Sequence, residues 1–304
     1  MTVSLGIDLG GLAMKNPVTT ASGTFAAGRE YNDFFDISAL GAVTTKGVSF
    51  AGWSGNATPR IAETPSGMLN SIGLQNPGVH AFVEHDLAWL AGRKVPVIVN
   101  VSGHSVDEYV QVIEVLEGYE AVSAYEVNIS CPNVDKGGMT FGTHAPSVEK
   151  IVASCRTATA RPLIVKLTPN VTDITEIARA AQAGGADALS LINTVLGMAI
   201  DSTTRRPQLA RIVGGLSGPA IKPIALRMVY ETHKAVDIPL LGMGGVTCAA
   251  DAIEFLLAGA TAVAVGTGNF MNPLCALEVI SGIEYYCEQQ GVADINELVG
   301  GLLC

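Results

Sequence analysis

The chain has 304 residues, which is near two average domains and also near one (β/α)₈ barrel of about 250 residues with insertions. Lys and Arg number 18 and Asp and Glu number 28, so the net charge of −10 argues against a nucleic-acid partner, which needs a basic surface. Hydrophobic residues make up 48% of the chain, charged residues make up 15%, and the mean hydropathy is +0.37. Such a chain can bury a large core, which excludes global disorder.

The longest uncharged apolar stretch, Phe255 to Met271, contains three glycines, two threonines and an asparagine. It falls short of the about 20 apolar residues that a membrane-spanning helix needs. We interpret it as a helix end, a Gly-Ala turn and a buried strand. The segment Met1 to Leu12 contains Asp8 and has no basic start, so no signal peptide is expected. We therefore expect a soluble, cytoplasmic protein with no membrane contact.

The cysteines lack the C-x₂-C spacing of zinc and iron–sulfur sites, so no metal is predicted on this chain. Without a secretory signal, free thiols are expected. Four of the cysteines lie in apolar helical segments or at their edges, where Cys behaves as a small buried hydrophobe. These four are Cys155, Cys248, Cys275 and Cys287.

Short apolar, β-branched runs recur along the chain and alternate with amphipathic helical patterns. The runs are apolar on both faces, which is typical of parallel strands covered on both sides. Caps such as Ser105 before Val106, and Thr172 followed by Thr175 and Glu176, mark helix starts. The expected strands are Pro17–Ala21, Ala42–Lys46, Val95–Val101, Tyr125–Ile129, Leu163–Leu167, Ala188–Asn193, Pro239–Met243 and Ala262–Val265. The expected helices are Val79–Leu90, Val106–Leu116, Ser147–Thr157, Thr172–Ala183, Pro219–Ala235, Cys248–Ala258 and Pro273–Gln290.

These elements fit either a closed barrel or an open doubly wound sheet. Gly-rich or polar loops follow nearly every strand at its carboxyl end. In a barrel those ends converge on one mouth, whereas an open sheet would spread them along an edge. The sequence therefore favours an α/β fold of the (β/α)₈ TIM barrel type, formed as a single domain by residues 1–304.

Insertions modify this barrel. The segment Leu5–Lys15 alternates around Gly10-Gly11 and predicts a hairpin before the first strand, placed at the barrel floor. Long loops follow strands two, four and six, and uncommonly long loops in a compact domain are often lids or binding loops. These loops are Val48–Gln75, Pro132–Ala145 and Val195–Gly218, with Pro132–Gly142 as the candidate lid.

Glycine pairs end the last two strands and predict a phosphate site. Gly244-Gly245 follows strand seven, and Gly266-Thr267-Gly268 follows strand eight. Loops at these positions form the recurrent phosphate site of barrels, where backbone N–H groups meet the anion. Gly218 joins them, and plain tight turns are the alternative. Because Met271 stands where a third glycine belongs, a Rossmann site is not supported.

Two lysines stand at strand ends, Lys46 and Lys166. A lysine in an apolar strand is seldom fully buried unless it is paired, so a structural ion pair is one alternative. The others are a Schiff-base lysine and a fixed cation opposite developing negative charge. The residues do not separate these alternatives.

Asn100, Asn128 and Asn193 end strands three, four and six, and Asn70 lies in the long loop after strand two. Asn is depleted in strands, so this set is unusual. Each amide offers donors and an acceptor, and together they match a planar ligand with alternating C=O and N–H groups.

Cys131 follows strand four directly and begins a polar, Gly-rich stretch. A loop cysteine at the mouth can act as nucleophile or base once its pKa is lowered. His144 is the nearest histidine in sequence and is expected to be a surface or capping residue, so a Cys-His hydrolase is weakly supported. The alternative that Cys131 acts as a base and accepts a proton remains open.

Together these motifs resemble the class 1 dihydroorotate dehydrogenases, and the similarity runs nearly end to end. The segment Glu63-Thr-Pro-Ser-Gly-Met-Leu-Asn resembles the B-type catalytic subunit. The resemblance implies an FMN-containing (β/α)₈ barrel that oxidises dihydroorotate to orotate in pyrimidine synthesis. Membrane-bound class 2 enzymes have Ser at the position of Cys131 and carry a membrane segment. The matching motifs are Ala21-Ser-Gly-Thr-Phe, Thr45-Lys-Gly, Asn70-Ser-Ile-Gly-Leu-Gln-Asn-Pro-Gly, Asn128-Ile-Ser-Cys-Pro-Asn, Val165-Lys-Leu-Thr-Pro-Asn and Gly242-Met-Gly-Gly-Val.

The resemblance also implies roles for site residues. Cys131 would be the base that takes the C5 proton while hydride leaves C6 for flavin N5, and Lys46 would share the catalytic site. The flavin ring and ribityl chain would contact Ser22, Lys46, Gly47, Asn100, Asn128, Lys166 and Ile192. The FMN phosphate would contact Gly218, Gly244, Gly245, Gly266 and Thr267. Dihydroorotate would contact Lys46, Asn70, Ser71, Ile72, Gly73, Leu74, Asn128, Asn193 and Thr194.

The chain has neither a dinucleotide fingerprint nor cysteine spacing for an iron–sulfur cluster. The B-type resemblance implies a separate electron-transfer subunit that carries FAD and a [2Fe–2S] cluster, in a heterotetramer of two plus two, with NAD as final acceptor.

A Schiff-base aldolase that uses Lys166 is the alternative enzyme. A non-catalytic scaffold has little support, because a scaffold has no reason to gather Asn, Lys and Cys at one mouth.

Overall fold

Eight short parallel strands form the centre of the structure, a computed structural model that describes residues 3–130 and 141–303. Their order in the sheet is β3-β16-β15-β10-β9-β8-β7-β4, and each lies within one of the eight segments expected to be strands, apart from a one-residue offset at β8. Neighbouring strands pair in parallel, as long crossover connections require. The strands are β3 (Val18–Thr20), β4 (Val43–Thr44), β7 (Val97–Val101), β8 (Ala124–Asn128), β9 (Leu163–Lys166), β10 (Ala188–Leu191), β15 (Leu240–Met243) and β16 (Ala262–Val265).

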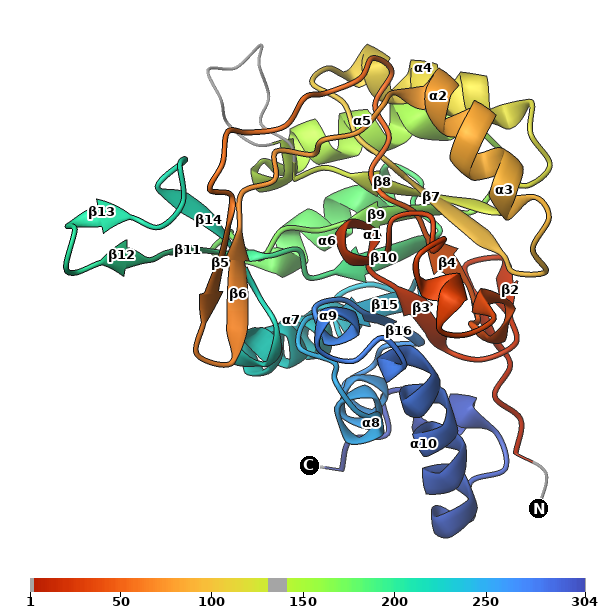
Figure 1. Cartoon of the computed structure of the whole chain (residues 1–304). Helices are drawn as coiled ribbons and strands as arrows, with labels where there is room; N and C mark the ends of the chain where they lie inside the picture. The colour runs from red at the N-terminus through yellow and green to blue at the C-terminus, as the bar shows by residue number, and fades with distance from the viewer. Residues whose placement is uncertain (1–2, 131–140, 304) are drawn as a thin grey trace.

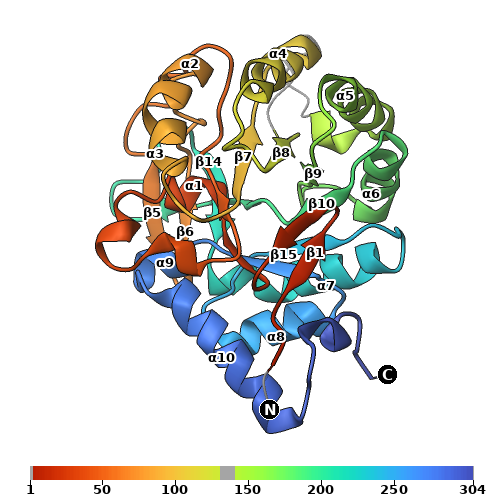
Figure 2. The same cartoon turned by 90° about the vertical axis from the view of Figure 1, so that its right-hand side faces the viewer.

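The first and last strands of this order approach each other and bring the sheet round into a barrel. The hydroxyl of Thr19 donates to the carbonyl of Ala42 at 2.9 Å, and the N–H of Gly41 donates to the carbonyl of Val18 at 2.9 Å. Figure 2 shows the helices as a ring around the strands. The expected (β/α)₈ architecture is confirmed, and the carboxyl ends of the strands therefore meet at one mouth.

The helices cover the barrel with amphipathic faces. In α4 the buried residues Tyr109, Val112, Ile113 and Leu116 follow helical spacing. The expected segment Val79–Leu90 is helical but contains a π-helical turn. The long helices are α2 (Val79–Phe82) continued by η3 (Val83–Leu87) and α3 (Ala88–Leu90), then α4 (Val106–Glu117), α5 (Ala145–Ala158), α6 (Ile174–Ala183), α7 (Lys222–His233), α8 (Ala249–Leu257) and α10 (Cys275–Gln290). Short helical turns are α1 (Ser22–Phe25), η1 (Tyr31–Asp33), η2 (Ile37–Ala39), η4 (Phe141–Thr143), η5 (Pro219–Ile221), α9 (Gly268–Met271) and η6 (Ile295–Leu298).

One predicted helix cap is confirmed and one is wrong. The Ser105 hydroxyl accepts a hydrogen bond from the Glu108 N–H at 3.3 Å at the start of α4. At α6 the cap is Asp173 rather than Thr172, since the Asp173 carboxylate accepts from the Thr175 N–H at 2.8 Å. A carboxylate at this position also interacts favourably with the positive end of the helix dipole.

The predicted N-terminal hairpin is confirmed as β1 (Ile7–Leu9) and β2 (Leu12–Met14). Gly10 turns the chain with φ +63°, and a Cβ there would collide with the carbonyl of Asp187, which precedes β10. Leu9 and Leu12 are buried. The hairpin therefore covers amino ends of the barrel strands, opposite the mouth, as the floor placement requires.

The insertions after the second and sixth barrel strands do not stand apart as two independent loops. They pair as an antiparallel sheet of order β11-β14-β6-β5, which projects from the barrel on the left of Figure 1. Asn70 lies opposite Gly215, and Leu69 lies opposite Leu216. The strands are β5 (Ile61–Thr64), β6 (Gly67–Asn70), β11 (Val195–Met198) and β14 (Val213–Ser217), with β12 (Ile200–Asp201) and β13 (Arg206–Pro207) extending the second insertion.

The insertion after the fourth strand lies mostly outside the described residues, and so does most of the candidate lid Pro132–Gly142. The interpretation of Phe255–Met271 is confirmed, because α8 ends at Leu257 and β16 follows a turn. Across residues 3–130 and 141–303, none of the helices combines the length and the apolar character needed to cross a bilayer.

The four described cysteines are free thiols. Cys155, Cys275 and Cys287 are buried as expected, and burial raises the pKa of the Cys155 thiol to about 12 and that of Cys275 to about 11. The expectation for Cys248 is wrong, since this residue is exposed. It occupies the N-cap position of α8.

Candidate active site

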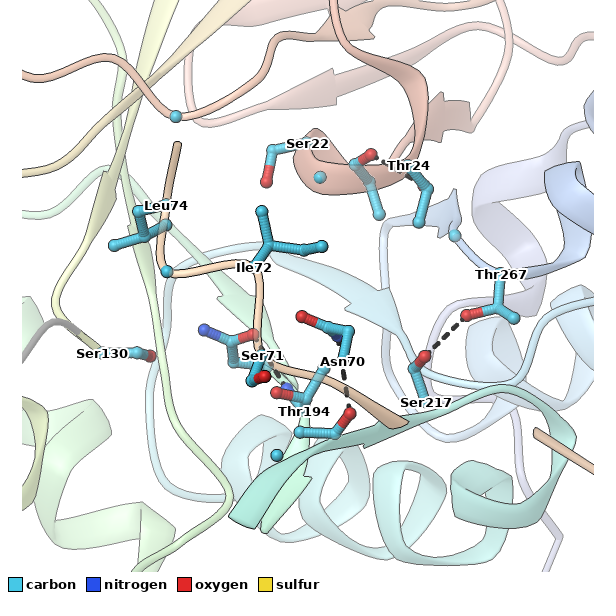
Figure 3. Close-up of a pocket in the computed structure, with 18 of the residues that line it drawn as sticks. Ser22, Thr24, Asn70, Ser71, Ile72, Leu74, Ser130, Thr194, Ser217 and Thr267 are labelled. Carbon is cyan, nitrogen blue, oxygen red and sulfur yellow. Dashed lines mark hydrogen bonds between the residues drawn. The ribbon is translucent and has the colours of Figure 1, made fainter. Parts of the chain in front are cut away.

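A cavity of about 830 Å³ opens at the carboxyl ends of the barrel strands, beneath the antiparallel sheet. Its size is in the range of cavities that bind small ligands. Figure 3 shows side chains from distant parts of the chain gathered around it. The sequence-predicted site residues that line it are Ser22, Lys46, Gly47, Asn70, Ser71, Ile72, Gly73, Leu74, Asn128, Lys166, Ile192, Asn193, Thr194, Gly218, Gly244, Gly245, Gly266 and Thr267.

One predicted site residue does not line the cavity, and a second lies outside the described residues. Asn100 is fully buried behind the cavity wall, and a Cβ on Gly47 would lie 2.8 Å from its Oδ1. That Oδ1 has no hydrogen-bond partner in the described part of the chain. Cys131 lies outside the described residues and follows Ser130, which lines the cavity.

One end of the cavity is built from glycine turns. Gly218, Gly244 and Gly245 have φ values of +97°, +122° and +88°, which side chains rarely adopt. A Cβ on Gly245 would also lie 2.8 Å from the Cβ of Lys222. Consecutive backbone N–H groups in such turns form anion-binding concavities. The predicted phosphate site therefore has a suitable surface, with the Thr267 hydroxyl bonded to Ser217 Oγ at 2.8 Å beside it (Figure 3).

A carboxylate that sequence reasoning missed holds the chain that directly follows the Gly244-Gly245 turn. Asp251 accepts hydrogen bonds from the Thr247 N–H and hydroxyl, both at 2.8 Å, and from the Cys248 N–H at 3.1 Å. Its other oxygen accepts from Lys222 Nζ at 2.7 Å. Burial opposes ionisation, but the hydrogen bonds outweigh it and the pKa of Asp251 is lowered. The hydrogen bond to Asp251 in turn raises the pKa of Lys222. An acidic residue three positions after a helix N-cap was the available signal.

The opposite end is built from polar side chains. Asn70 Nδ2 donates to the Gly215 carbonyl at 3.4 Å, which ties the end of β6 to β14. The Thr194 N–H donates to Asn193 Oδ1 at 2.8 Å, and the Ser130 N–H donates to Asn128 Oδ1 at 3.2 Å. These bonds hold three of the predicted asparagines and orient their amides.

Several polar atoms around the cavity are left without partners. Ser71 Oγ and Ser130 Oγ are buried, and neither has a hydrogen-bond partner among the described residues. Buried polar groups in folded proteins are nearly always bonded, so these atoms are expected to bond to a ligand or to ordered water in the cavity. Figure 3 places Ser130 at the end of the cavity remote from Thr267.

Lys166 is paired with a second residue that sequence reasoning missed. Its Nζ lies 3.8 Å from Glu126 Oε2, and the side chains are 6% and 0% exposed. The ion-pair alternative for Lys166 is therefore confirmed. Because a buried carboxylate faces Lys166, the geometry favours an electrostatic role over that of a Schiff-base nucleophile. A glutamate within the apolar run Tyr125–Ile129 was the signal, because a buried charge needs a partner.

Further residues at the rim were not predicted. Trp53 stacks on His104 with ring centroids 4.0 Å apart, and both line the cavity. Arg211 also lines it and donates to Asn56 Oδ1 at 3.3 Å. His144 occupies the N-cap position of α5 with Nδ1 3.0 Å from Ser147 Oγ, so its interpretation as a surface or capping residue is confirmed. Among the described residues, no group of three His, Cys, Asp or Glu side chains could hold a metal ion.

Comparison with known proteins gives a consistent result. The family model described as dihydroorotate dehydrogenase matches residues 4–286. The dihydroorotate dehydrogenase B (NAD(+)) catalytic subunit of Alkaliphilus oremlandii is 57% identical over 98% of this chain and 99% of its own length. The corresponding subunit of Porphyromonas gingivalis is 55% identical over 96% of this chain and 95% of its own length. The crystal structure of Eimeria tenella DHODH in complex with ferulenol matches with a TM-score of 0.82 over 98% of this chain and 88% of that one, at 22% identity, which shows the fold.

Proposed function

Because this chain belongs to the dihydroorotate dehydrogenase family, we propose that its cavity oxidises dihydroorotate to orotate in pyrimidine synthesis, with FMN as cofactor. One observation carries the proposal: eighteen residues predicted from the sequence line one cavity, with glycine turns at one end and cations and amides at the other. A flavin phosphate needs the first kind of surface, and a planar carboxylate substrate needs the second.

The residues present fit FMN. The turns at Gly218, Gly244 and Gly245 leave no room for side chains and expose backbone N–H groups to a phosphate. The Oδ1 of Asn100, beside Gly47, is an acceptor with no hydrogen-bond partner among the described residues. We assign the phosphate to Gly218, Gly244, Gly245, Gly266 and Thr267, and the ring and ribityl chain to Ser22, Lys46, Gly47, Asn100, Asn128, Lys166 and Ile192.

Dihydroorotate is assigned to the polar end. The amides of Asn70, Asn128 and Asn193 supply the donors and acceptors that match a ring with alternating C=O and N–H groups, and Lys46 pairs with its carboxylate. Ser71, Ile72, Gly73, Leu74 and Thr194 complete the contact surface.

The reaction removes two hydrogens from the substrate ring. The base takes the C5 proton, the C6 hydrogen leaves as hydride with two electrons, and a C5=C6 double bond forms. Bound FMN supplies the acceptor for that hydride. Cys131 is the proposed base, since a thiol is acidic enough to be tuned toward neutral pH. Lys46 contributes positive charge beside the substrate.

We propose that NAD⁺ is the final electron acceptor and that a partner subunit transfers the electrons to it. The relatives at 57% and 55% identity are named as NAD(+)-linked catalytic subunits, which supports this assignment. The proposed partner carries FAD and a [2Fe–2S] cluster in a two-plus-two heterotetramer. The cytoplasmic location expected from the sequence stays a prediction.

An assay of the purified chain tests this function. Dihydroorotate is supplied with either an artificial dye or NAD⁺, and orotate and NADH are measured. We expect orotate formation with the dye and negligible NADH. Brisk NADH formation would contradict the proposed partner, and the lack of orotate formation with any dye would contradict the proposed reaction.

A further inference from the structure

Glu126 is a fully buried carboxylate in the interior of the barrel, next to the cavity but not part of its lining. It interacts with residues on three other strands. Oε2 lies 3.8 Å from Lys166 Nζ and accepts a hydrogen bond from Asn100 Nδ2, while Oε1 accepts from the Ser190 hydroxyl at 2.7 Å. Two of these partners, Lys166 and Asn100, are residues assigned above to the flavin.

The strand register brings these groups together. Asn100 on β7 lies opposite Glu126 on β8, and Lys166 on β9 lies opposite Ser190 on β10. All four residues are at most 5% exposed. Lys166 lines the cavity whereas Glu126 does not, so the ammonium is the member of the ion pair that a ligand can contact.

A lone ammonium beside a flavin favours any state of the ligand that carries more negative charge. A carboxylate a few ångström away opposes that field, and both effects are strong where water is excluded. The Glu126 carboxylate therefore reduces the electrostatic effect of Lys166 on the ligand. It also fixes the directions of Lys166 Nζ and the Asn100 amide.

We propose that Glu126 is a positioning residue that orients Lys166 toward FMN, fixes the Asn100 amide behind Gly47 and, by offsetting the charge of Lys166, sets the reduction potential of the bound flavin. This inference rests on the proposed function, because it takes FMN as the ligand. A carboxylate that served the fold alone would affect protein stability and leave the potential unchanged.

The test compares the wild type with Glu126→Gln, which keeps the size of the side chain and one of the two oxygens that accept hydrogen bonds from Asn100 and Ser190, but removes the charge. The midpoint potential of bound FMN is measured by spectroelectrochemical titration, and FMN affinity is measured by fluorescence. We expect Glu126→Gln to shift the equilibrium at least tenfold toward reduced FMN, which for a two-electron couple is about 30 mV upward. Ser190→Ala, which perturbs the same carboxylate without changing its charge, should shift it less than threefold.

Glu126→Asp provides a second variant in case Glu126→Gln does not retain FMN. The shorter side chain keeps the charge but withdraws it from Lys166, so a smaller shift in the same direction is expected. A wild-type potential in the FMN-bound variant, Gln or Asp, would overturn the inference. If neither variant retained FMN while Ser190→Ala did, the carboxylate would serve binding rather than the potential, which would also overturn it.

Failure of the proposed function has a different signature. In that case the wild-type protein itself would take up no FMN, or its FMN would not respond to dihydroorotate. Wild-type FMN that is reduced by dihydroorotate, together with unchanged potentials in the variants, would reject only the role of Glu126.

Discussion

At one end of the cavity the surface is backbone, exposed by the positive φ values of Gly218, Gly244 and Gly245, whereas at the other end it is made of side chains. Asn193 and Asn128 there are held by bonds to neighbouring N–H groups. The two ends therefore respond to opposite changes. Adding one carbon damages the glycine end, and removing a polar group damages the polar end.

The most severe effect is expected at Lys166, which lines the cavity and whose removal is expected to abolish FMN binding or to slow flavin reduction. Lys166→Ala should lose FMN or slow flavin reduction by about 10²–10³-fold, because one preorganised group contributes about 3–4 kcal/mol where charge develops. It also leaves Glu126 buried without its cationic partner. FMN content and stopped-flow reduction by dihydroorotate measure this, with exposed Lys94→Ala as control. Full FMN content with normal reduction kinetics would contradict the role of Lys166.

Cys131→Ser sharpens the account of the polar end by separating chemistry from binding. The variant should bind orotate as the wild type does, yet lose about 10²–10⁴-fold in rate at neutral pH, the usual contribution of a general base. Orotate binding is followed by the change in flavin absorbance, and the rate by anaerobic stopped flow. Near-wild-type flavin reduction would assign the base to another residue.

Gly245→Ala tests the glycine end by adding a Cβ to one of its turns. The new Cβ would meet the Cβ of Lys222 at 2.8 Å and force φ +88° on a residue with a side chain. Strain of this kind costs about 1–3 kcal/mol, so FMN affinity should fall by about ten- to a hundredfold. The control is Gly118→Ala, where the nearest neighbour of a Cβ is a carbonyl at 3.8 Å. Equal FMN affinity in both variants would show that the Gly245 turn does not hold the phosphate.

Asp251→Asn should give the smallest effect, since it loosens the glycine end indirectly. Loss of one charge-assisted bond to Thr247 or Lys222 should cost about 1.5–3 kcal/mol of stability, while FMN affinity, which depends on Asp251 only indirectly, should fall a few-fold. Because the pKa of Asp251 is lowered in the folded protein, its contribution is present above its unfolded pKa of about 4 and is lost as pH falls through the folded value.

Urea unfolding of wild type and Asp251→Asn between pH 7 and pH 3 checks this dependence. The difference in stability should stay constant down to about pH 5 and shrink below about pH 4. A difference that grows as the pH falls would contradict the assigned direction.

The strands, the hairpin and the glycine turns could be predicted because their signals are local. A buried parallel strand is an apolar run, and the positions of Gly244 and Gly245 after such a run already indicate a turn at the mouth. The resemblance then supplied the ligand for each end. Eighteen of the predicted residues line the cavity for this reason.

The antiparallel sheet above the mouth could not be predicted in this way. Its central register, Asn70 opposite Gly215, joins two insertions that are far apart in the sequence. Neither insertion has a local sequence pattern that identifies the other as its pairing partner. The partners of Glu126 and Asp251 were missed for the same reason, since an ion pair between strands or helices depends on the fold. Cys248 was misjudged because an apolar neighbourhood in sequence says little about a helix-cap position.

The measurement that tests the central claim most directly is an anaerobic absorbance titration of the purified chain after loading with FMN. The account predicts a bound-flavin spectrum in which the visible absorbance is lost when dihydroorotate is added, with no partner subunit and no NAD⁺ present. A chain that takes up no FMN, or a bound-flavin spectrum that dihydroorotate leaves unchanged, would contradict it.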